Sequence, residues 1–220
     1  MYATTYSFYP GRPLDEYLPP LLAQVTKARA NGARLAVSTS IFAENSPVVA
    51  LAALTESMAE GDAMRAHQLA DPEFTAMQAK VAVMSRKPPC TQLIELLTLV
   101  EMSSPAPTRR LQITFTPKVG GLRDLLRYLM EPLDDLESLR TSLGVVAMGP
   151  GTGDVVMNVL AASATELDRL HDALAASEDF AARQRNAAAL LVSTPKQELF
   201  EILAPMPSRP ARRAEPPTPG

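Results

Sequence analysis

Two residue types that often mark functional sites are scarce in this chain of 220 residues, which has one cysteine and two histidines. A single cysteine, Cys90, allows neither an intramolecular disulfide nor a cysteine-based zinc site, and we interpret it as a spectator thiol. Neither His67 nor His171 has a second histidine or a cysteine at helical ligand spacing. Because zinc and related metals need clustered imidazole or thiolate ligands, we expect no metal site.

The chain also lacks an excess of positive charge and any long apolar run. The formal net charge of -3 and the sequence pI of about 5.5 argue against a nucleic-acid binder, which usually carries a basic stripe. No run approaches the roughly 18 apolar residues of a membrane-spanning helix, and the first residues show no basic and apolar signal segment. We therefore expect no nucleic-acid partner, no membrane partner and a cytoplasmic location.

No motif for an organic cofactor is recognisable. No histidine, tyrosine, methionine or cysteine stands in a haem-binding pattern. The one glycine-rich turn, at 149–153, connects two expected strands, whereas dinucleotide and phosphate loops connect a strand to a helix. We expect the protein to use no metal, haem or nicotinamide.

What the sequence does contain is an internal repeat. Residues 70–97 align without a gap over residues 176–203, at a constant offset of 106. The matches include Phe74 with Phe180, which carry more weight than matched alanines in an alanine-rich chain. Self-similarity over so long a period predicts a duplicated domain, since the units of solenoid proteins are about 20–50 residues long.

Upstream, the alignment continues with small shifts. Phe8 aligns with Phe115 at an offset of 107. The pair Val48-Val49 aligns with Val155-Val156 at the same offset, which makes Leu51 the counterpart of Asn158. The pair Thr55-Glu56 aligns with Thr165-Glu166 at an offset of 110, which implies about three extra residues in this part of the second half.

Each half has the hydrophobic pattern of strand, helix, two strands, helix and strand. In the first half these elements are expected at 2–8, 14–31, 34–42, 47–55, 56–84 and 91–100, and in the second at 111–115, 121–136, 140–148, 154–162, 166–191 and 197–203. The long helical stretch of the first half should break near Asp71-Pro72, because proline interrupts a helix. The order is that of the ferredoxin-like fold, which places the chain in the α+β class.

Domain limits follow from the repeat and from proline content. The first repeat is expected at 1–102 and the second at 109–204, with a linker at 103–108 between them. Six prolines fall in the last sixteen residues, 205–220, which have no periodic apolar face. We expect this tail to be disordered or polyproline-like.

Two segments carry a resemblance to a known family. Residues 69–81 (LADPEFTAMQAKV), followed by residues 91–97 (TQLIELL), resemble the NIPSNAP-like branch of the dimeric α+β barrel superfamily. The opening segment 2–18 (YATTYSFYPGRPLDEYL) is similar to the first strand, Pro-Gly turn and first helix of that family. The second half keeps the layout but has Ser177-Glu178-Asp179-Phe180 in place of the Asp-Pro-Glu-Phe motif.

The resemblance implies two ferredoxin-like repeats whose four-stranded sheets close face to face into a pseudo-dimeric barrel within one chain. The helices would then cover the outside, and the space inside the barrel or under the helices would hold a ligand. The superfamily includes cofactor-free oxygenases, cyclases and dehydratases that act on aromatic or polyketide-like molecules, haem enzymes, and proteins of no known activity. The fold by itself therefore does not select a function.

Five residues are candidates for a site. Glu95 and Glu201 recur at the same repeat position on the last strand of each half, each on a face shared with leucines, which fits either a pocket carboxylate or a sheet-edge residue. His171 could act in acid–base chemistry or pack at the edge of the core. Tyr6, on the aromatic face of the first strand, and Asn158, a lone amide in an apolar strand, are candidates for binding substrate.

Two functions remain open from the sequence. One is a cofactor-independent oxygenase, cyclase or related enzyme that acts on a small apolar or aromatic molecule, with Glu95, Glu201 and His171 as the catalytic groups. The other is a non-catalytic NIPSNAP-like module that binds a ligand or another protein. A homo-oligomer of this chain is a further expected partner. A barrel interior that is hollow and carries polar side chains favours the enzyme, and a filled apolar interior favours the module.

Deleting residues 208–220 tests the tail. The segment has too few apolar side chains to offset the entropy of ordering it, so the melting temperature should change by no more than a few degrees. Thermal unfolding followed by circular dichroism measures the change. A large drop would mean that the tail docks on the folded protein.

Overall fold

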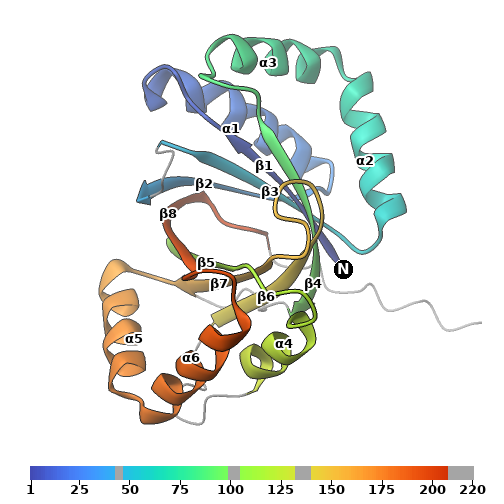
Figure 1. Cartoon of the computed structure of the whole chain (residues 1–220). Coiled ribbons are helices and arrows are strands. Elements are labelled where there is room, and N and C mark those ends of the chain that lie inside the picture. The colour runs from blue at the N-terminus through green and yellow to red at the C-terminus, as the bar shows by residue number, and fades with distance from the viewer. Residues whose placement is uncertain (43–46, 99–104, 132–139, 208–220) are drawn as a thin grey trace, which may run out of the picture.

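The computed structural model describes residues 1–42, 47–98, 105–131 and 140–207 (Figure 1). The first half contains β1 (Tyr2–Phe8), α1 (Leu14–Ala30), β2 (Arg34–Phe42), β3 (Val49–Thr55), α2 (Met58–Ala70), α3 (Pro72–Val83) and β4 (Cys90–Thr98). The second half contains β5 (Arg109–Phe115), α4 (Leu122–Met130), β6 (Arg140–Met148), β7 (Val155–Ala161), α5 (Ala164–Ala176), α6 (Glu178–Leu190) and β8 (Lys196–Ala204). The expected order of elements is confirmed in both halves, with the second helical stretch divided in two.

The strands form one closed antiparallel barrel in the order β1-β3-β2-β8-β5-β7-β6-β4. Each half contributes four neighbouring strands, and the halves join where β2 pairs with β8 and β4 pairs with β6. Figure 1 shows the helices of the two halves on opposite outer sides of this barrel. The expected α+β class and the barrel of two ferredoxin-like repeats are therefore confirmed.

The two seams between the halves are built alike. In the first, the pairing of β2 with β8 shifts register between Val37 and Ser38. In the second, the pairing of β6 with β4 shifts register between Leu143, which pairs with Thr98, and Gly144, which pairs with Leu96. Leu143 and Gly144 are the counterparts of Val37 and Ser38 at the offset of 106. Bulges are specific local features of a strand pair, so their recurrence shows that the halves are related by a pseudo-twofold axis.

The structure corrects part of the sequence alignment. β3 and β7 begin at Val49 and Val155, both fully buried, so their offset is 106 and the alignment of Val48-Val49 with Val155-Val156 was wrong. The counterpart of Asn158 is therefore Ala52. The alignment of Phe8 with Phe115 at 107 is confirmed, because these residues end β1 and β5. The offset of 110 was also wrong, because the caps Ser57 and Ser163 of α2 and α5 are 106 residues apart. Short matches such as Val-Val and Thr-Glu recur by chance, whereas cap positions are fixed by helix geometry.

Helix caps divide the second helical stretch at the same place in each half. The Asp71 carboxylate accepts a hydrogen bond of 3.0 Å from the Glu73 amide, and the Ser177 hydroxyl accepts one of 3.2 Å from the Phe180 amide. Pro72 occupies the first turn of α3, where its missing N–H is not needed. Phe74 and Phe180 are both half-buried at equivalent positions, as the repeat predicts.

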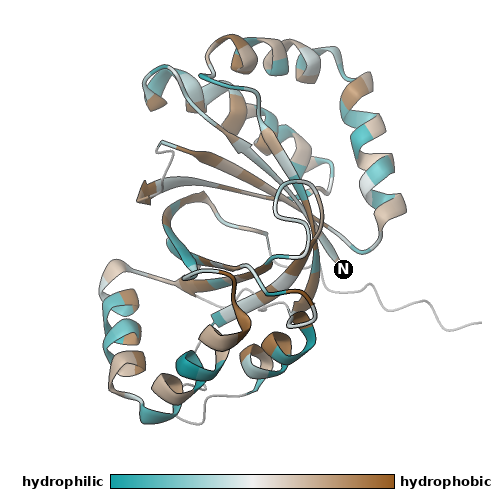
Figure 2. Ribbon diagram, in the orientation of Figure 1, coloured by the Kyte–Doolittle hydropathy of each residue, from teal (hydrophilic) through white to brown (hydrophobic). Residues whose placement is uncertain are grey.

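Strand residues alternate between an outer face, covered by helices, and an inner face that lines the lumen of the barrel. On the outer face of the first half, Tyr17, Leu21 and Val25 of α1 pack against Leu35 and Val37. The second half has an equivalent outer cluster that contains Phe115, Leu125, Leu143 and Val155. Figure 2 shows apolar residues concentrated on the strands and on the helix surfaces that face them.

The inner faces form a third cluster, which spans both halves. Its buried members are Ala3, Leu54, Ile94, Val146 and Val156. Met206, from the start of the expected tail, packs against this cluster. Arg29 donates a hydrogen bond of 2.6 Å to the Pro205 carbonyl oxygen, so residues 205–207 lie against the barrel. The remainder of the tail, 208–220, lies outside the described residues.

The expected linker also contacts the fold where it is described. Pro107 is fully buried, and Arg140 donates a hydrogen bond of 2.8 Å to the Pro105 carbonyl oxygen. Residues 103 and 104 lie outside the described part of the chain. Within the described residues, no helix combines the length and the apolar character needed to cross a bilayer.

Replacing Gly144 tests the seam between β4 and β6. A Cβ atom at this position would lie 2.6 Å from Ile94 Cγ2 and 2.8 Å from the Glu95 carbonyl oxygen, so Gly144→Ala should lower the free energy of unfolding by about 1–3 kcal/mol. Gly61→Ala is the control, because its Cβ has room in α2 and alanine should add up to about 1 kcal/mol there. Urea unfolding measures both, and equal stability of the two variants would contradict the seam packing.

Candidate functional site

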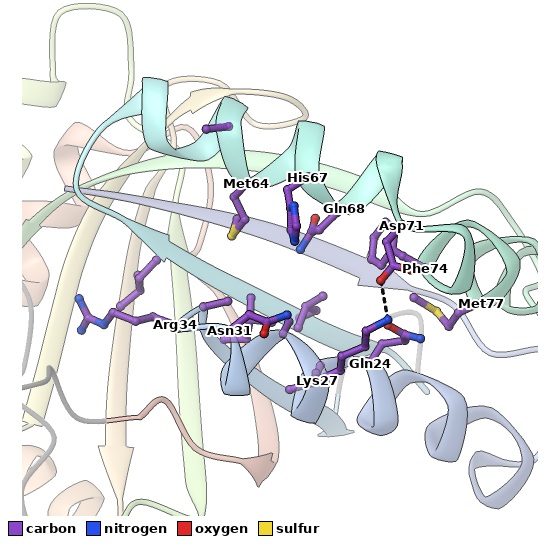
Figure 3. A pocket seen from close by; sticks show the side chains of 18 of the residues that line it. Gln24, Lys27, Asn31, Arg34, Met64, His67, Gln68, Asp71, Phe74 and Met77 are labelled. Carbon is purple, nitrogen blue, oxygen red and sulfur yellow. Dashed lines mark hydrogen bonds and ion pairs between the residues drawn. The ribbon is translucent and has the colours of Figure 1, made fainter.

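A cleft of about 360 Å³ lies on the outer face of the first half, between α1 and α2 and above β2 and β3 (Figure 3). α2 packs over the floor of the cleft through the half-buried Met64, whereas Leu170, the equivalent residue of α5, is buried. The corner between α2 and α3 is held in place through α3, whose Val81 is buried in the cluster that includes Tyr17. The Tyr17 hydroxyl and Ser85 Oγ lie 3.0 Å apart, which fixes α1 against the end of α3.

The floor and one wall of the cleft are apolar. Leu21, Val25 and Leu35 are buried beneath it, and the half-buried Leu51 completes the floor. The wall is formed by Met64, Phe74 and Met77 from α2 and α3. Thioether and aromatic side chains adapt to flat apolar ligands, and a volume of this size is at the lower end of the range for small-molecule sites.

Polar side chains rim the cleft from both helices. Figure 3 shows His67 and Gln68 projecting from α2 into the space above α1, which carries Gln24 and ends at Asn31. Met64, His67 and Asp71 lie about one turn apart, so they share one face of the α2 segment. The rim thus combines one imidazole with three amide side chains, which can orient a ligand whose flat body lies on the floor.

An ion-pair cluster closes one end of the cleft. Lys27 Nζ lies 2.7 Å from Glu73 Oε2 and 2.9 Å from Asp71 Oδ2, and Figure 3 shows the Lys27–Asp71 contact. The hydrogen bonds to Glu73 and Asp71 raise the pKa of Lys27, and the bond from Lys27 lowers the pKa of the Asp71 carboxyl. Because the pairs are exposed to solvent, their role is to position the corner between α2 and α3 over α1, with little effect on stability.

Arg34 lies at the other end of the cleft, where β2 begins. Its Nη1 atom is 3.8 Å from Glu56 Oε1. Its Nε atom is buried and has no hydrogen-bond partner among the described residues. A buried donor without a partner is costly to the folded state.

The three residues expected to be catalytic do not line the cleft. Glu95 is exposed on the outer face of β4. Glu201 lies on the outer face of β8, where it pairs with Arg109 at 3.1 Å and is 46% exposed. His171 is on the outer surface of α5, with 79% of its side chain exposed. These three groups are separated from one another and share no site, so their catalytic roles stay predictions.

The two residues expected to bind substrate also lie apart. Tyr6 is on the outer face of β1 beside Leu51 of the cleft floor, and burial raises the pKa of its hydroxyl, an effect that Arg65 opposes. Asn158 faces the lumen, where its Nδ2 donates a hydrogen bond of 3.3 Å to Ser142 Oγ. Neither residue lines the cleft, although Tyr6 pairs with Leu51 of its floor.

His67 is the residue that sequence reasoning did not select. Both histidines lie on the first helix after the two central strands of their half, and no sequence signal separates them. His67 lines the cleft, whereas His171 points to solvent from α5. Among the described residues, no three His, Cys, Asp or Glu side chains gather in an arrangement that could hold a metal ion.

Among the comparisons with known proteins, only the comparison with solved structures finds similar proteins, and it identifies the fold. No family model matches the sequence, and no curated protein matches it. A presumed monooxygenase from Fusobacterium nucleatum is 7% identical with a TM-score of 0.67, over 97% of this chain and 98% of its own. A presumed monooxygenase from Lactobacillus acidophilus NCFM is 8% identical with a TM-score of 0.66, over 91% of this chain and 93% of its own.

A third solved structure, an anthrone oxidase-like protein, is 13% identical with a TM-score of 0.61, over 92% of this chain and 91% of its own. These similarities cover nearly the whole chain, so they concern the duplicated barrel and not one half of it. The chain has the dimeric α+β barrel fold of these monooxygenase-like proteins. The finer resemblance to the NIPSNAP-like branch stays a prediction.

Filling the cleft tests whether it binds ligands. Ala63 lines the cleft and Ala66 does not, although both are exposed on α2. Ala63→Trp should weaken binding of the apolar fluorophore anilinonaphthalene sulfonate at least tenfold, because the indole occupies the space above the floor. Ala66→Trp should leave the Kd within a factor of two. Fluorescence titration measures both, and equal effects of the two variants would show that the probe binds elsewhere.

Proposed function

We propose that the protein is a small-molecule enzyme of the oxygenase type, which binds a flat apolar or aromatic substrate in the cleft between α1 and α2. The observation that carries this proposal is the cleft itself, with an apolar floor and one imidazole on a polar rim. The fold shared with monooxygenase-like and anthrone oxidase-like proteins supports it. The expectation that no cofactor is needed belongs to the proposal.

Oxygenation without a cofactor requires a substrate that can supply electrons itself. A phenol or carbon acid that loses a proton becomes an electron-rich anion, which can react with O2. For a substrate of the anthrone type, a CH2 group and O2 would yield a carbonyl group and water. The protein has to bind the ring system, accept the first proton and keep the anion next to dissolved O2.

The rim of the cleft provides groups for these tasks. His67 is suited to be the general base, because imidazole is the side chain that most often accepts protons in catalysis, and it can accept a phenolic or carbon-bound proton. Gln24, Asn31 and Gln68 can donate hydrogen bonds to substrate oxygens, where negative charge develops. The apolar floor stabilises the ring system by removing its surface from water.

A non-catalytic binding module is the second candidate function. It is favoured by the exposure of α2 and of His67, because a cleft open to water does not shield a reactive anion. The discriminating observation is turnover. A module of this kind would bind aromatic ligands in the cleft but would consume no oxygen.

The two histidines provide a matched test of catalysis. His67→Gln should lower the kcat for oxygen consumption with anthrone by about 10²–10⁴-fold, which is the usual contribution of a general base. His171→Gln, at a solvent-exposed position of the equivalent helix, should retain wild-type activity. An oxygen electrode measures the rate, and isothermal titration calorimetry checks that substrate affinity is kept.

Two results would contradict the proposal. Equal activity of both variants would remove His67 from the chemistry, and an inactive wild-type protein that still binds anthrone would favour the binding module.

Native mass spectrometry of the purified protein tests for a retained aromatic ligand. Elemental analysis and an absorption spectrum test the expectation of no cofactor, because a stoichiometric metal or a Soret band would overturn it.

A further inference from the structure

The lumen of the barrel differs between the two halves. Arg110 faces the lumen from β5, where its repeat counterpart on β1 is Ala3. Asn158 faces it from β7, where the counterpart on β3 is Ala52. The second half thus places a cation and an amide where the first half has two alanines, although the backbone is the same.

The guanidinium of Arg110 has no polar partner among the described residues. It stacks on the ring of Phe200, with Cζ 4.2 Å from the ring centroid, and Phe200 is only 4% exposed. The Nε atom of Arg110 is buried and makes no hydrogen bond within the described chain. The stacking covers one face of the guanidinium and leaves its N–H donors, which lie in the ring plane, unused.

The neighbouring carboxylate does not neutralise this cation. Glu198 faces the lumen from β8, where Lys196 Nζ lies 3.3 Å from its Oε1 atom. Burial lowers the pKa of Arg110 to about 10, an effect that the charge of Glu198 partly opposes. Arg110 is therefore still protonated at neutral pH. Within the described residues, no ion pair or hydrogen bond joins Glu198 to Arg110, so the carboxylate acts on the guanidinium only through its charge.

The lumen beside this charge is open to solvent. Thr5, Ala36 and Ala52 lie in the middle of their strands with side chains directed inward, yet each remains partly accessible to solvent. The same is true of Gln112 and Ser142 in the second half. Mid-strand residues of a filled barrel would be buried, so the lumen is accessible to solvent at these positions.

A second polar atom without a partner lies near Arg110. Asn158 pairs with Gln112, the next inward residue after Arg110, so the two side chains are diagonal neighbours about 7–8 Å apart at Cβ. Its Oδ1 atom is buried and accepts no hydrogen bond from the described residues. Turning the amide over would exchange its O and N atoms and still leave one of them unpaired.

We propose that the lumen of the second half binds a small-molecule oxyanion, a carboxylate or a phosphate, on the guanidinium of Arg110. The Nε donor of Arg110 is buried without a hydrogen-bond partner among the described residues, which is costly, and the planar N–H donors of arginine match two oxygens of such a group. Asn158 contacts the remainder of the ligand, and Phe200 holds the guanidinium in place. This site is separate from the cleft, since it lies on the opposite face of the barrel wall.

Two adjacent arginines provide the test. Arg110→Met removes the lumen cation and keeps the side-chain length, and Arg109→Met removes an outer-face cation that pairs with Glu201. Each protein is titrated with sodium phosphate and, separately, with sodium benzoate at constant ionic strength, and the melting temperature is recorded. In the wild type and in Arg109→Met, at least one anion should raise the melting temperature in a saturable way.

In Arg110→Met the saturable part should disappear, which corresponds to at least about tenfold weaker binding. The response that remains in this variant measures the general effect of the salt. The anion whose effect on the melting temperature differs more between the wild type and Arg110→Met identifies the ligand class: phosphate indicates a phosphate ligand, and benzoate indicates a carboxylate. Identical responses of all three proteins to both anions would overturn the proposal and would leave buried water as the partner of Arg110.

A measurement on the wild-type protein covers the case in which Arg110→Met does not fold. In a nitrogen-15 spectrum of arginine-labelled protein, the Arg110 Nε–H resonance should shift with added anion and saturate, while the Arg109 resonance should not. An Arg110 resonance that stays in place in both titrations contradicts the proposal. The cleft variant Ala63→Trp should show the wild-type shift, because it changes the other face of the wall.

Discussion

The pairing of four strand edges is the constraint on which the rest of this structure depends. Each half is a four-stranded sheet whose outer strands, β2 and β4 or β6 and β8, would otherwise expose unpaired amides and carbonyls. The β2–β8 and β4–β6 seams satisfy all four edges within one chain. Closure turns the uncovered face of each sheet inward and the helix-covered face outward. The lumen and the position of the helices both follow from it.

Joining the halves in one chain allows each to change without the other. In a barrel of two identical subunits, every lumen residue and every cleft would occur twice. Here α2 covers its sheet through the half-buried Met64, beside a cleft that His67 lines, whereas α5 covers its sheet through the buried Leu170. The lumen position that is Ala3 in one half is Arg110 in the other. The two candidate sites are thus each a departure from the symmetry that the seams preserve.

The cleft and the lumen share one wall. Leu51 of β3 forms part of the cleft floor, and the next residue, Ala52, faces the lumen. A β-strand presents successive residues to opposite faces, so β3 forms part of the cleft floor with one face and lines the lumen with the other. The apolar outer face suits a flat substrate that is held by burial, and the charged inner face suits an anion that is held by hydrogen bonds. The fold supplies both environments without specifying a reaction.

The sequence alone determined the repeat, the order of strands and helices, and the break at Asp71-Pro72, because these depend on local hydrophobic periodicity, caps and proline geometry. It also showed that Glu95 and Glu201 share a face with leucines. Alternation defines two faces of a strand but not which one turns inward, and both carboxylates lie on the outer face.

Arg110 and Gln112 lie on the face of β5 opposite Leu111 and Ile113, and alternation in the sequence separates these two faces without showing which one turns inward. Only the tertiary structure decided that this polar face lines the lumen. It likewise decided that His67 faces a cleft and His171 faces solvent, since that depends on how each helix packs against its sheet. Packing distances between elements are set by contacts across the whole fold, and no local pattern in the sequence encodes them.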